Sequence, residues 1–273
     1  MNYGSLTTEA RNPRSTHIDT MPTEDMLRLM NDENKKVPEA VDLVMPQITQ
    51  AVEAIAARMK RGGRLIYIGA GTSGRLGAID AAECPPTFGV SPSLVTALIA
   101  GGPEAMMRAV EGGEDDGEAG VRELAALEPA PDDSVVGISA AGGAAYVVEA
   151  VKYARRLGCF TAGITCNASS ALEQAAEVTI APDVGPEVLT GSTRLKAGTA
   201  QKLILNMIST GVMIRLGMVY ENMMINVRPT NIKLRDRAIR ILCAVSGQEY
   251  AACGKALDEA DGSIRDAIAI LKK

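Results

Sequence analysis

The sequence predicts an α/β protein with a doubly wound parallel sheet, helices on both faces of the sheet, and a small C-terminal helical domain. Short apolar runs recur along the chain without polar alternation, which is typical of strands buried on both faces. Helical stretches separate these runs, as in a parallel sheet built from strand–helix units. Glycine-rich segments follow two of the runs directly, where the carboxyl ends of parallel strands would face one crevice.

The elements follow from these patterns in chain order. The first 36 residues are polar and have no clear period, so we expect them to wrap the surface or a partner. From Val37 to Met59, apolar residues recur at three- and four-residue spacing and predict an amphipathic helix that ends at Gly62-Gly63. Strands are expected at 65–68, 94–99, 135–138, 159–165 and 178–180. Helices are expected from the first glycine-rich segment to Ala82 and at 103–110, 115–126, 144–157, 169–175 and about 191–217.

Beyond about Arg237 the pattern changes to short Ala-rich helices punctuated by glycines. We therefore divide the chain into a domain at 1–236 and a helical module at 237–273. The module is too short to be very stable unless it docks on another part of the protein.

The composition excludes several classes of protein. Of the 273 residues 47% are apolar and 22% charged, which rules out global disorder. There are 28 Lys and Arg against 33 Asp and Glu, and no Trp, so neither a nucleic-acid nor an anionic-membrane partner is expected. The uncharged stretch 84–102 contains three prolines and cannot form a spanning helix.

The cysteines and the histidine predict neither disulfides nor a metal site. Five cysteines are scattered without a C-x-x-C pair, and His17 is the only histidine, so a structural zinc site lacks ligands. An odd number of cysteines and an N-terminus without an apolar signal stretch favour reduced thiols and a cytoplasmic location. Acid–base chemistry must then come from carboxylates, Lys or Tyr.

The first glycine-rich segment, GAGTSG at 69–74, lies between a predicted strand and a predicted helix. It matches the dinucleotide fingerprint, but the next strand ends in LIAG without the acidic residue that would hold a ribose. Thr72 and Ser73 instead place hydroxyls beside exposed amides at a helix N-terminus, which suits a phosphate monoester. We favour a sugar phosphate over NAD, with a ligand-free tight turn as the remaining alternative.

Two further segments could bind an anion. Ser139-Ala140-Ala141-Gly142-Gly143 follows another strand, and anything it binds would depend on backbone N–H groups. The segment 185–199 brings hydroxyls and two cations to the start of a long helix, with Ser192 or Thr193 as its expected N-cap. The alternatives are a plain glycine-rich connection and a well-capped helix with surface charges.

Two carboxylates stand in segments that could aim them. Glu83 is expected to end a helix in a rigid turn before Cys84-Pro85-Pro86, and Glu114 follows Gly112-Gly113. Two carboxylates in different surroundings suit a reaction in which one group takes a proton and the other gives one. Either could instead be an ordinary solvated acid, and Asp115-Asp116 matches no metal-binding loop pattern.

Together these segments resemble the N-acetylmuramic acid 6-phosphate etherases, a branch of the sugar isomerase (SIS) superfamily. The resemblance covers most of the chain and is carried by TEARNPRSTHIDTMPTEDMLRLMNDENKKV, YIGAGTSGRLGAIDAAECPPTFG, EGGEDD, GPEVLTGSTRLKAGTAQKLILNMISTG and NIKLRDRAIRI. It implies cleavage of the lactyl ether by elimination and hydration, giving N-acetylglucosamine 6-phosphate and D-lactate. It also implies a homodimer, no metal or organic cofactor, and a ubiquitin-associated-like fold for the C-terminal module.

The resemblance also implies roles for individual residues. Glu114 would be the base at C2 and would activate water, and Glu83 would be the acid that protonates the departing lactate. The substrate-binding candidates are Gly71, Thr72, Ser73, Gly74, Arg75, Ser139, Ala141, Gly142, Gly143, Glu187, Ser192 and Lys196.

One segment departs from the family. Where family members carry a Ser-Gly-Arg-Thr-Pro-like second loop, this chain has Ala141-Gly142-Gly143-Ala144-Ala145. Hydrogen bonds to a charged group contribute about 1.5–3 kcal/mol each, so losing them would weaken phosphate binding unless Arg75, Lys196 or backbone amides compensate. The alternatives are a non-catalytic phosphosugar sensor, an aldose–ketose isomerase of the same fold and, more distantly, an NAD-linked enzyme.

Overall fold

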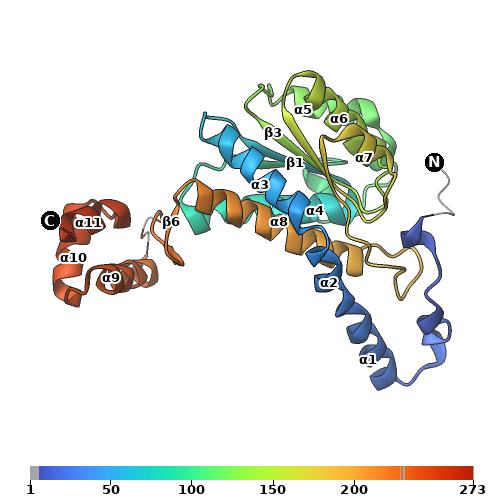
Figure 1. Ribbon diagram of the computed structural model, residues 1–273, viewed down its shortest axis with the longest axis horizontal. Helices are drawn as coiled ribbons and strands as arrows, with labels where there is room; N and C mark the ends of the chain where they lie inside the picture. Colours follow the sequence, from blue (N-terminus) through green and yellow to red (C-terminus); the bar gives the residue numbers. More distant parts are fainter. Residues whose placement is uncertain (1–5, 228, 230, 273) are drawn as a thin grey trace.

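The computed structural model describes residues 6–227, 229 and 231–272, which fold around a five-stranded parallel sheet (Figure 1). The strands are β1 (Leu65–Gly69), β2 (Val95–Ile99), β3 (Ser134–Ile138), β4 (Phe160–Ile164) and β5 (Val178–Ile180). Their spatial order is β2-β1-β3-β4-β5, with Leu65 beside Val95 on one side and Ser134 on the other. After β2 the chain crosses back over β1 and adds β3 on the other side of it, so the order in which strands are added reverses between β1 and β3. In doubly wound sheets this switch point is where ligands bind.

Helices cover both faces of the sheet, as the sequence predicts. Leu65 and Tyr67 of β1 enter one hydrophobic core, and Ile66 enters the other, because successive side chains of a strand point to opposite faces. The first face packs against α2 (Lys36–Asp42), α3 (Met45–Met59), α4 (Gly71–Phe88) and α8 (Lys196–Arg215). The second packs against α5 (Gly117–Ala125), α6 (Ala145–Arg156) and α7 (Ala171–Ala175).

Three helix predictions need correction. The helix expected over 37–59 is broken between α2 and α3, where Pro46 occupies the first turn of α3 and has no N–H to continue the preceding helix. The helix expected over 103–110 is only the short 3₁₀ turn η5 (Pro103–Met106). By contrast, α4 runs through Pro85 and Pro86 to Phe88, because Cys84 and Phe88 are buried in the core and hold this last turn.

The N-terminal segment projects from one end of the molecule (Figure 1). Three 3₁₀ turns, η2 (Thr7–Glu9), η3 (Pro13–Ser15) and η4 (Ile18–Thr20), lead into α1 (Thr23–Asn34). A buried ion pair between Glu33 of α1 and Lys196 of α8, with Nζ and Oε2 2.8 Å apart, ties this segment to the body.

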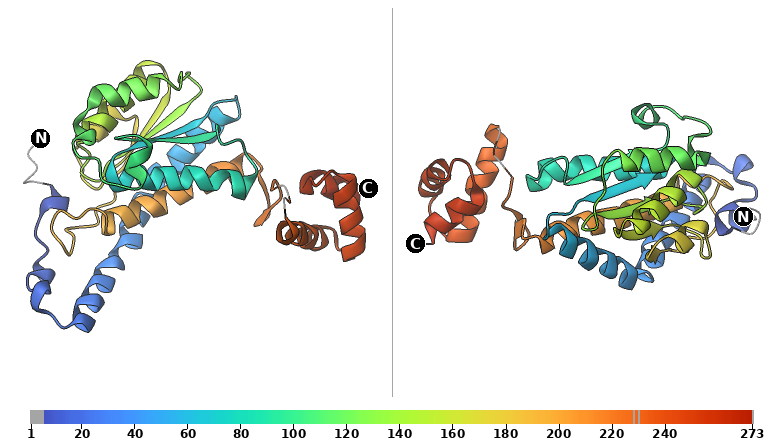
Figure 2. Two further views of the ribbon diagram at one scale, coloured as in Figure 1. Left: turned by 180° about the vertical axis from the view of Figure 1, so that it is seen from behind. Right: turned by 90° about the horizontal axis from the view of Figure 1, so that it is seen from above.

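The C-terminal helices lie at the other end, beyond a short hairpin (Figure 2). The hairpin is β6 (Val219–Tyr220) and β7 (Met223–Met224), and α9 (Ile232–Ser246), α10 (Tyr250–Glu259) and α11 (Ile264–Leu271) share a hydrophobic cluster of their own. The expected division between residues 236 and 237 falls inside α9. Within the part of the chain that the structure describes, no helix is long and apolar enough to cross a membrane.

Candidate active site

The first glycine-rich segment brings the start of α4 directly onto the end of β1. A Cβ on Gly74 would lie 2.7 Å from the carbonyl oxygen of Gly69, so only glycine permits this approach. Gly74 N–H donates to the carbonyl oxygen of Ala70. The preceding N–H groups, of Gly71, Thr72 and Ser73, make no backbone hydrogen bond within the described residues, as expected for the first turn of a helix. This turn therefore presents unpartnered donors at the carboxyl edge of the sheet.

The second glycine-rich segment is held from behind by the loop that follows β4. Cys166 N–H and Asn167 Nδ2 both donate to the carbonyl oxygen of Ala140, at 2.9 and 3.0 Å, and Leu172 N–H donates to that of Gly142 at 2.9 Å. Gly142 has a φ of +71°, and a Cβ there would lie 2.4 Å from the Ser170 side chain. The carbonyl groups of Ala140 and Gly142 therefore accept hydrogen bonds on the side of the segment that faces away from the sheet edge.

The amide groups of the same segment remain available on the other side. The N–H groups of Ala141, Gly143 and Ala144 have no partner among the hydrogen bonds of the described residues, and all three residues line a cavity at the sheet edge. The segment leads into α6, whose N-terminus therefore faces the same cavity as that of α4. Two helix N-termini converge there, which favours an anion.

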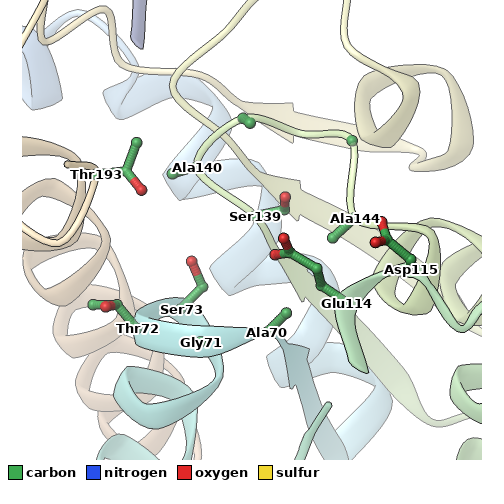
Figure 3. A pocket seen from close by; sticks show the side chains of 12 residues that line it. Ala70, Gly71, Thr72, Ser73, Glu114, Asp115, Ser139, Ala140, Ala144 and Thr193 are labelled. Carbon is green, nitrogen blue, oxygen red and sulfur yellow. The ribbon is translucent and has the colours of Figure 1, made fainter. Parts of the chain in front are cut away.

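This cavity has a volume of about 190 Å³ and lies at the switch point of the sheet. Figure 3 shows the Glu114 carboxylate beside Ser139, with Thr72, Ser73 and Thr193 across the cavity from them. Glu114 follows the turn at Gly112, where φ is +74°, and lies in the 3₁₀ turn η6 (Gly113–Asp115). No hydrogen bond or ion pair engages its carboxylate within the described residues, so it is free to act on a bound molecule.

A second cavity, of about 270 Å³, adjoins the first and shares Ala70, Gly71 and Glu114 with it. Arg75 lines this second cavity. Its guanidinium donates to the carbonyl oxygens of Met106 and Arg108, so it holds the 103–108 loop beside Glu114. Glu114 therefore stands between a cavity rich in amides and hydroxyls and one that contains a cation.

The structure gathers seven of the predicted substrate-binding residues and Glu114 around the two cavities. These seven are Gly71, Thr72, Ser73, Arg75, Ser139, Ala141 and Gly143. Gly74 and Gly142 lie directly behind the lining and permit the two close backbone approaches described above.

Glu83 lies outside both cavities and in a helix, not in the turn that the sequence predicts. It is exposed in α4, twelve residues after Gly71, and at 1.5 Å per residue this places it about 18 Å along the helix axis from the cavity. Within one copy of the chain, Glu83 and Glu114 therefore do not face a common ligand.

The segment 185–199 contributes Thr193 to the first cavity, but its predicted binding residues lie elsewhere. The Glu187 carboxylate accepts hydrogen bonds from the N–H groups of Lys196 and Ala197, at 3.1 and 2.9 Å, and so caps α8 in place of Ser192 or Thr193. Burial raises the pKa of Glu187, while these backbone hydrogen bonds oppose the shift. Lys196 Nζ is directed away from the cavities, toward Glu33 and the carbonyl oxygen of Pro186. Glu187, Ser192 and Lys196 line neither cavity.

Five residues that line the first cavity are not among the binding residues that the sequence predicts: Ala70, Asp115, Ala140, Ala144 and Thr193. Ala144 contributes only an amide, which no side-chain pattern reveals. The sequence marks Thr193 only as a possible N-cap, although its hydroxyl next to a glycine-rich turn is a usable signal. For Asp115 the sequence raises only a metal-binding role. Within the described residues no group of three or more His, Cys, Asp or Glu side chains is arranged to hold a metal ion.

Two family models match overlapping parts of the chain. Residues 47–155 match the glucokinase regulatory protein N-terminal SIS domain, and residues 115–210 match the SIS domain. Solved structures with the same architecture include a phosphoheptose isomerase from Francisella tularensis, with a TM-score of 0.57 and 19% identity over 70% of this chain and 98% of that one. A phosphoheptose isomerase from Neisseria gonorrhoeae gives a TM-score of 0.52 and 18% identity over the same shares. These two structures establish the fold.

Curated relatives are much closer in sequence. N-acetylmuramic acid 6-phosphate etherases from Yersinia pestis (strain Pestoides F) and Yersinia pseudotuberculosis (serotype O:1b, strain IP 31758) are each 53% identical to this chain. Each alignment covers 100% of this chain and 92% of the relative, so it includes the C-terminal helices as well as the sheet.

Proposed function

Since the chain belongs to the N-acetylmuramic acid 6-phosphate etherases, a family of SIS-domain enzymes, we propose that its cavity cleaves the lactyl ether of that sugar phosphate as a carbon–oxygen lyase. The products are N-acetylglucosamine 6-phosphate and D-lactate. The observation that carries the proposal is the free Glu114 carboxylate in a cleft to which α4 and α6 both present their N-termini.

The phosphate is proposed to bind between these two N-termini. The unpartnered N–H groups of the 71–73 and 141–144 segments supply donors, and Thr72, Ser73, Ser139 and Thr193 add hydroxyls. Backbone amides at a helix start bind anions without any particular side chain. They therefore offset the hydroxyl and guanidinium groups that the alanine- and glycine-rich second loop lacks. The Glu114 carboxylate beside these amides supports the enzyme over a phosphosugar sensor.

Glu114 is the proposed base. In the open-chain sugar the aldehyde at C1 makes the proton at C2 acidic; its removal expels lactate from C3, and water then adds to the alkene. Positioned proton transfer of this kind contributes typically 10²–10⁴-fold to the rate. The Glu114 carboxylate lies in the wall common to the two cavities, so it would reach C2 with the phosphate in the first cavity and the lactyl group toward Arg75 in the second.

Glu83 is proposed to act as the acid from a second copy of the chain. It is exposed on α4, and Ile79, one turn earlier on the same face, is exposed to 43%. An apolar residue beside a free carboxylate on a helix surface fits a subunit contact. In a homodimer, α4 of each subunit would then supply Glu83 to the partner's cavity, which resolves the distance of about 18 Å within one copy.

Release of D-lactate from N-acetylmuramic acid 6-phosphate tests the proposal directly, with lactate measured by a coupled dehydrogenase. We expect Glu114→Gln to lower kcat by about 10²- to 10⁴-fold, since the amide cannot accept the C2 proton. Glu118→Gln is the matched control, because this exposed acid on α5 lines neither cavity, and it should retain wild-type kcat.

Two outcomes would contradict the proposal. If the sugar phosphate raises the melting temperature of the wild-type protein but no lactate is released, the chain is a sensor. If an aldose–ketose product forms instead and Glu83→Gln is tolerated, it is an isomerase.

A further inference from the structure

One buried side chain next to the cleft is not explained by packing. Gln201 of α8 is only 1% exposed, and its Oε1 accepts a hydrogen bond from Ser73 Oγ at 3.0 Å. Its Nε2 is also buried and has no hydrogen-bond partner within the described residues. A buried amide donor without a partner is costly, so its retention at this place calls for a role.

Ser73 is the residue through which Gln201 meets the cleft. It lies in the first turn of α4, it is 6% exposed, and it lines the cavity (Figure 3). A hydroxyl has one hydrogen to donate. While that hydrogen points to Gln201 Oε1, Ser73 has no donor left for an anion in the cavity.

A rotation of the Gln201 amide by 180° reverses this arrangement. The amide nitrogen and oxygen exchange places with almost no change in shape, so the contact of 3.0 Å with Ser73 Oγ is kept. Nε2 then donates to Ser73 Oγ, and the Ser73 hydrogen becomes free for an oxygen atom in the cleft. Nε2 thereby gains an acceptor, and Oε1 takes the position in which Nε2 had no partner.

We propose that Gln201 is a positioning residue that turns the Ser73 hydroxyl into a donor for the phosphate of the bound sugar. This inference rests on the proposed function and extends it to a residue that touches no substrate. The proposed role also accounts for the unpartnered Nε2, which would donate to Ser73 Oγ once an anion occupies the cleft.

Gln201→Leu and Gln201→Met remove both polar atoms of the amide, Oε1 and Nε2, and keep most of the side-chain volume. We expect each to raise KM for N-acetylmuramic acid 6-phosphate and the inhibition constant of inorganic phosphate about 5- to 20-fold, with a smaller change in kcat, because a hydrogen bond to a charged group is weakened. Gln47→Leu is the control: Gln47 on α3 also has a buried, unpartnered amide atom but lines neither cavity, so both constants should stay unchanged.

A double-mutant cycle separates positioning from a merely structural role. If Gln201 acts through Ser73, Gln201→Leu should add less than about 2-fold in a Ser73→Ala background. Independent effects, or a lower melting temperature with unchanged constants, would overturn the inference. Stabilisation by inorganic phosphate, measured as a thermal shift, tests Gln201 even without turnover. It thereby distinguishes failure of this inference from failure of the proposed reaction.

Discussion

Glu33 shows how a single residue can be made part of the scaffold by its surroundings. Its side chain is 2% exposed and contacts Lys196, Arg14 and Lys36, each at 2.7 or 2.8 Å. Burial by itself would raise the pKa of the carboxyl, but the three cations outweigh burial and lower the pKa to about 2. Lys196, which the sequence suggests as a phosphate ligand, is thereby committed to joining α1 and α8.

The lowered pKa of Glu33 has a consequence for stability. Because the folded-state pKa of about 2 lies below the ordinary value of 4.5, this group stabilises the fold above pH 4.5 and loses its contribution as the pH falls toward 2. At pH 7 the difference between the pKa values corresponds to a contribution on the order of 3 kcal/mol. We expect Glu33→Gln to be less stable than wild type at pH 7 in urea unfolding. The difference in the free energy of unfolding between the two proteins should decrease below pH 4.5.

Glu24→Gln is the control for this comparison. Glu24 pairs with Arg28 on the surface, where both side chains are more than 70% exposed, and such pairs contribute about 0–1 kcal/mol. If the difference in the free energy of unfolding between Glu33→Gln and wild type stays constant with pH, lost packing and not the lost charge is responsible for it.

At the scale of elements, the cleft depends on how the 139–144 loop is supported from behind. Carbonyls of the loop accept hydrogen bonds from residues 166, 167 and 172, and Thr8 of the N-terminal segment in turn accepts one from Asn167 Nδ2 at 3.1 Å. The backbone, more than the side chains of the loop, therefore presents donors to the cavity. This arrangement supports the proposal that a loop without Arg or Thr binds the phosphate.

Gly142→Ala tests this support. The substitution meets both a φ of +71° and the Ser170 side chain at 2.4 Å, so the loop must shift. We expect a loss of about 2–3 kcal/mol in the free energy of unfolding and at least a 10-fold rise in KM. In the control Gly217→Ala, φ is +72° but nothing lies within 4 Å, so the loss should be about 1 kcal/mol with KM unchanged. Equal effects of the two substitutions would mean that contact with Ser170 does not shape the loop.

At the scale of the whole molecule, the proposed acid and base lie far apart within one copy of the chain. Glu114 lies in the cleft at the start of α4. Glu83 lies about 18 Å along the axis of α4 from that end, on the exposed surface of the helix. The projecting α1, with Leu27 exposed to 54%, likewise presents apolar surface outside the body of the protein (Figure 1). Both features fit an assembly in which subunits complete one another's sites.

Mixing two inactive variants tests this assembly. Glu83→Gln and Glu114→Gln subunits, unfolded together and refolded in equal amounts, should recover about a quarter of wild-type lactate release, because half of the dimers are mixed and each mixed dimer has one intact site. Each variant treated alone is the control. Absence of recovery, when mass spectrometry shows mixed dimers, would refute the action of Glu83 across the interface.

The amino-acid pattern alone was enough to predict the fold class, all five strands to within one residue at each end, and most of the residues that line the first cavity. Unbroken apolar runs followed by glycine-rich turns suffice for this, because burial on both faces and the approach of a helix to a strand end restrict the residues locally. These patterns are enough to predict that Gly71 to Ser73 and Ser139 line the cleft, because the position of each depends on the turn in which it lies.

The remaining features could be found only in the three-dimensional structure, because they depend on contacts between segments far apart in the chain. The sequence does not reveal that Lys196 pairs with Glu33, because the two are 163 residues apart. It likewise does not reveal the contact between Gln201 and Ser73, which are 128 residues apart. The continuation of α4 through Pro85 and Pro86 depends on burial of Cys84 and Phe88, which outweighs the loss of two helix hydrogen bonds. That extra turn places Glu83 on the exposed surface of α4, the position from which we propose that it acts on a second copy of the chain.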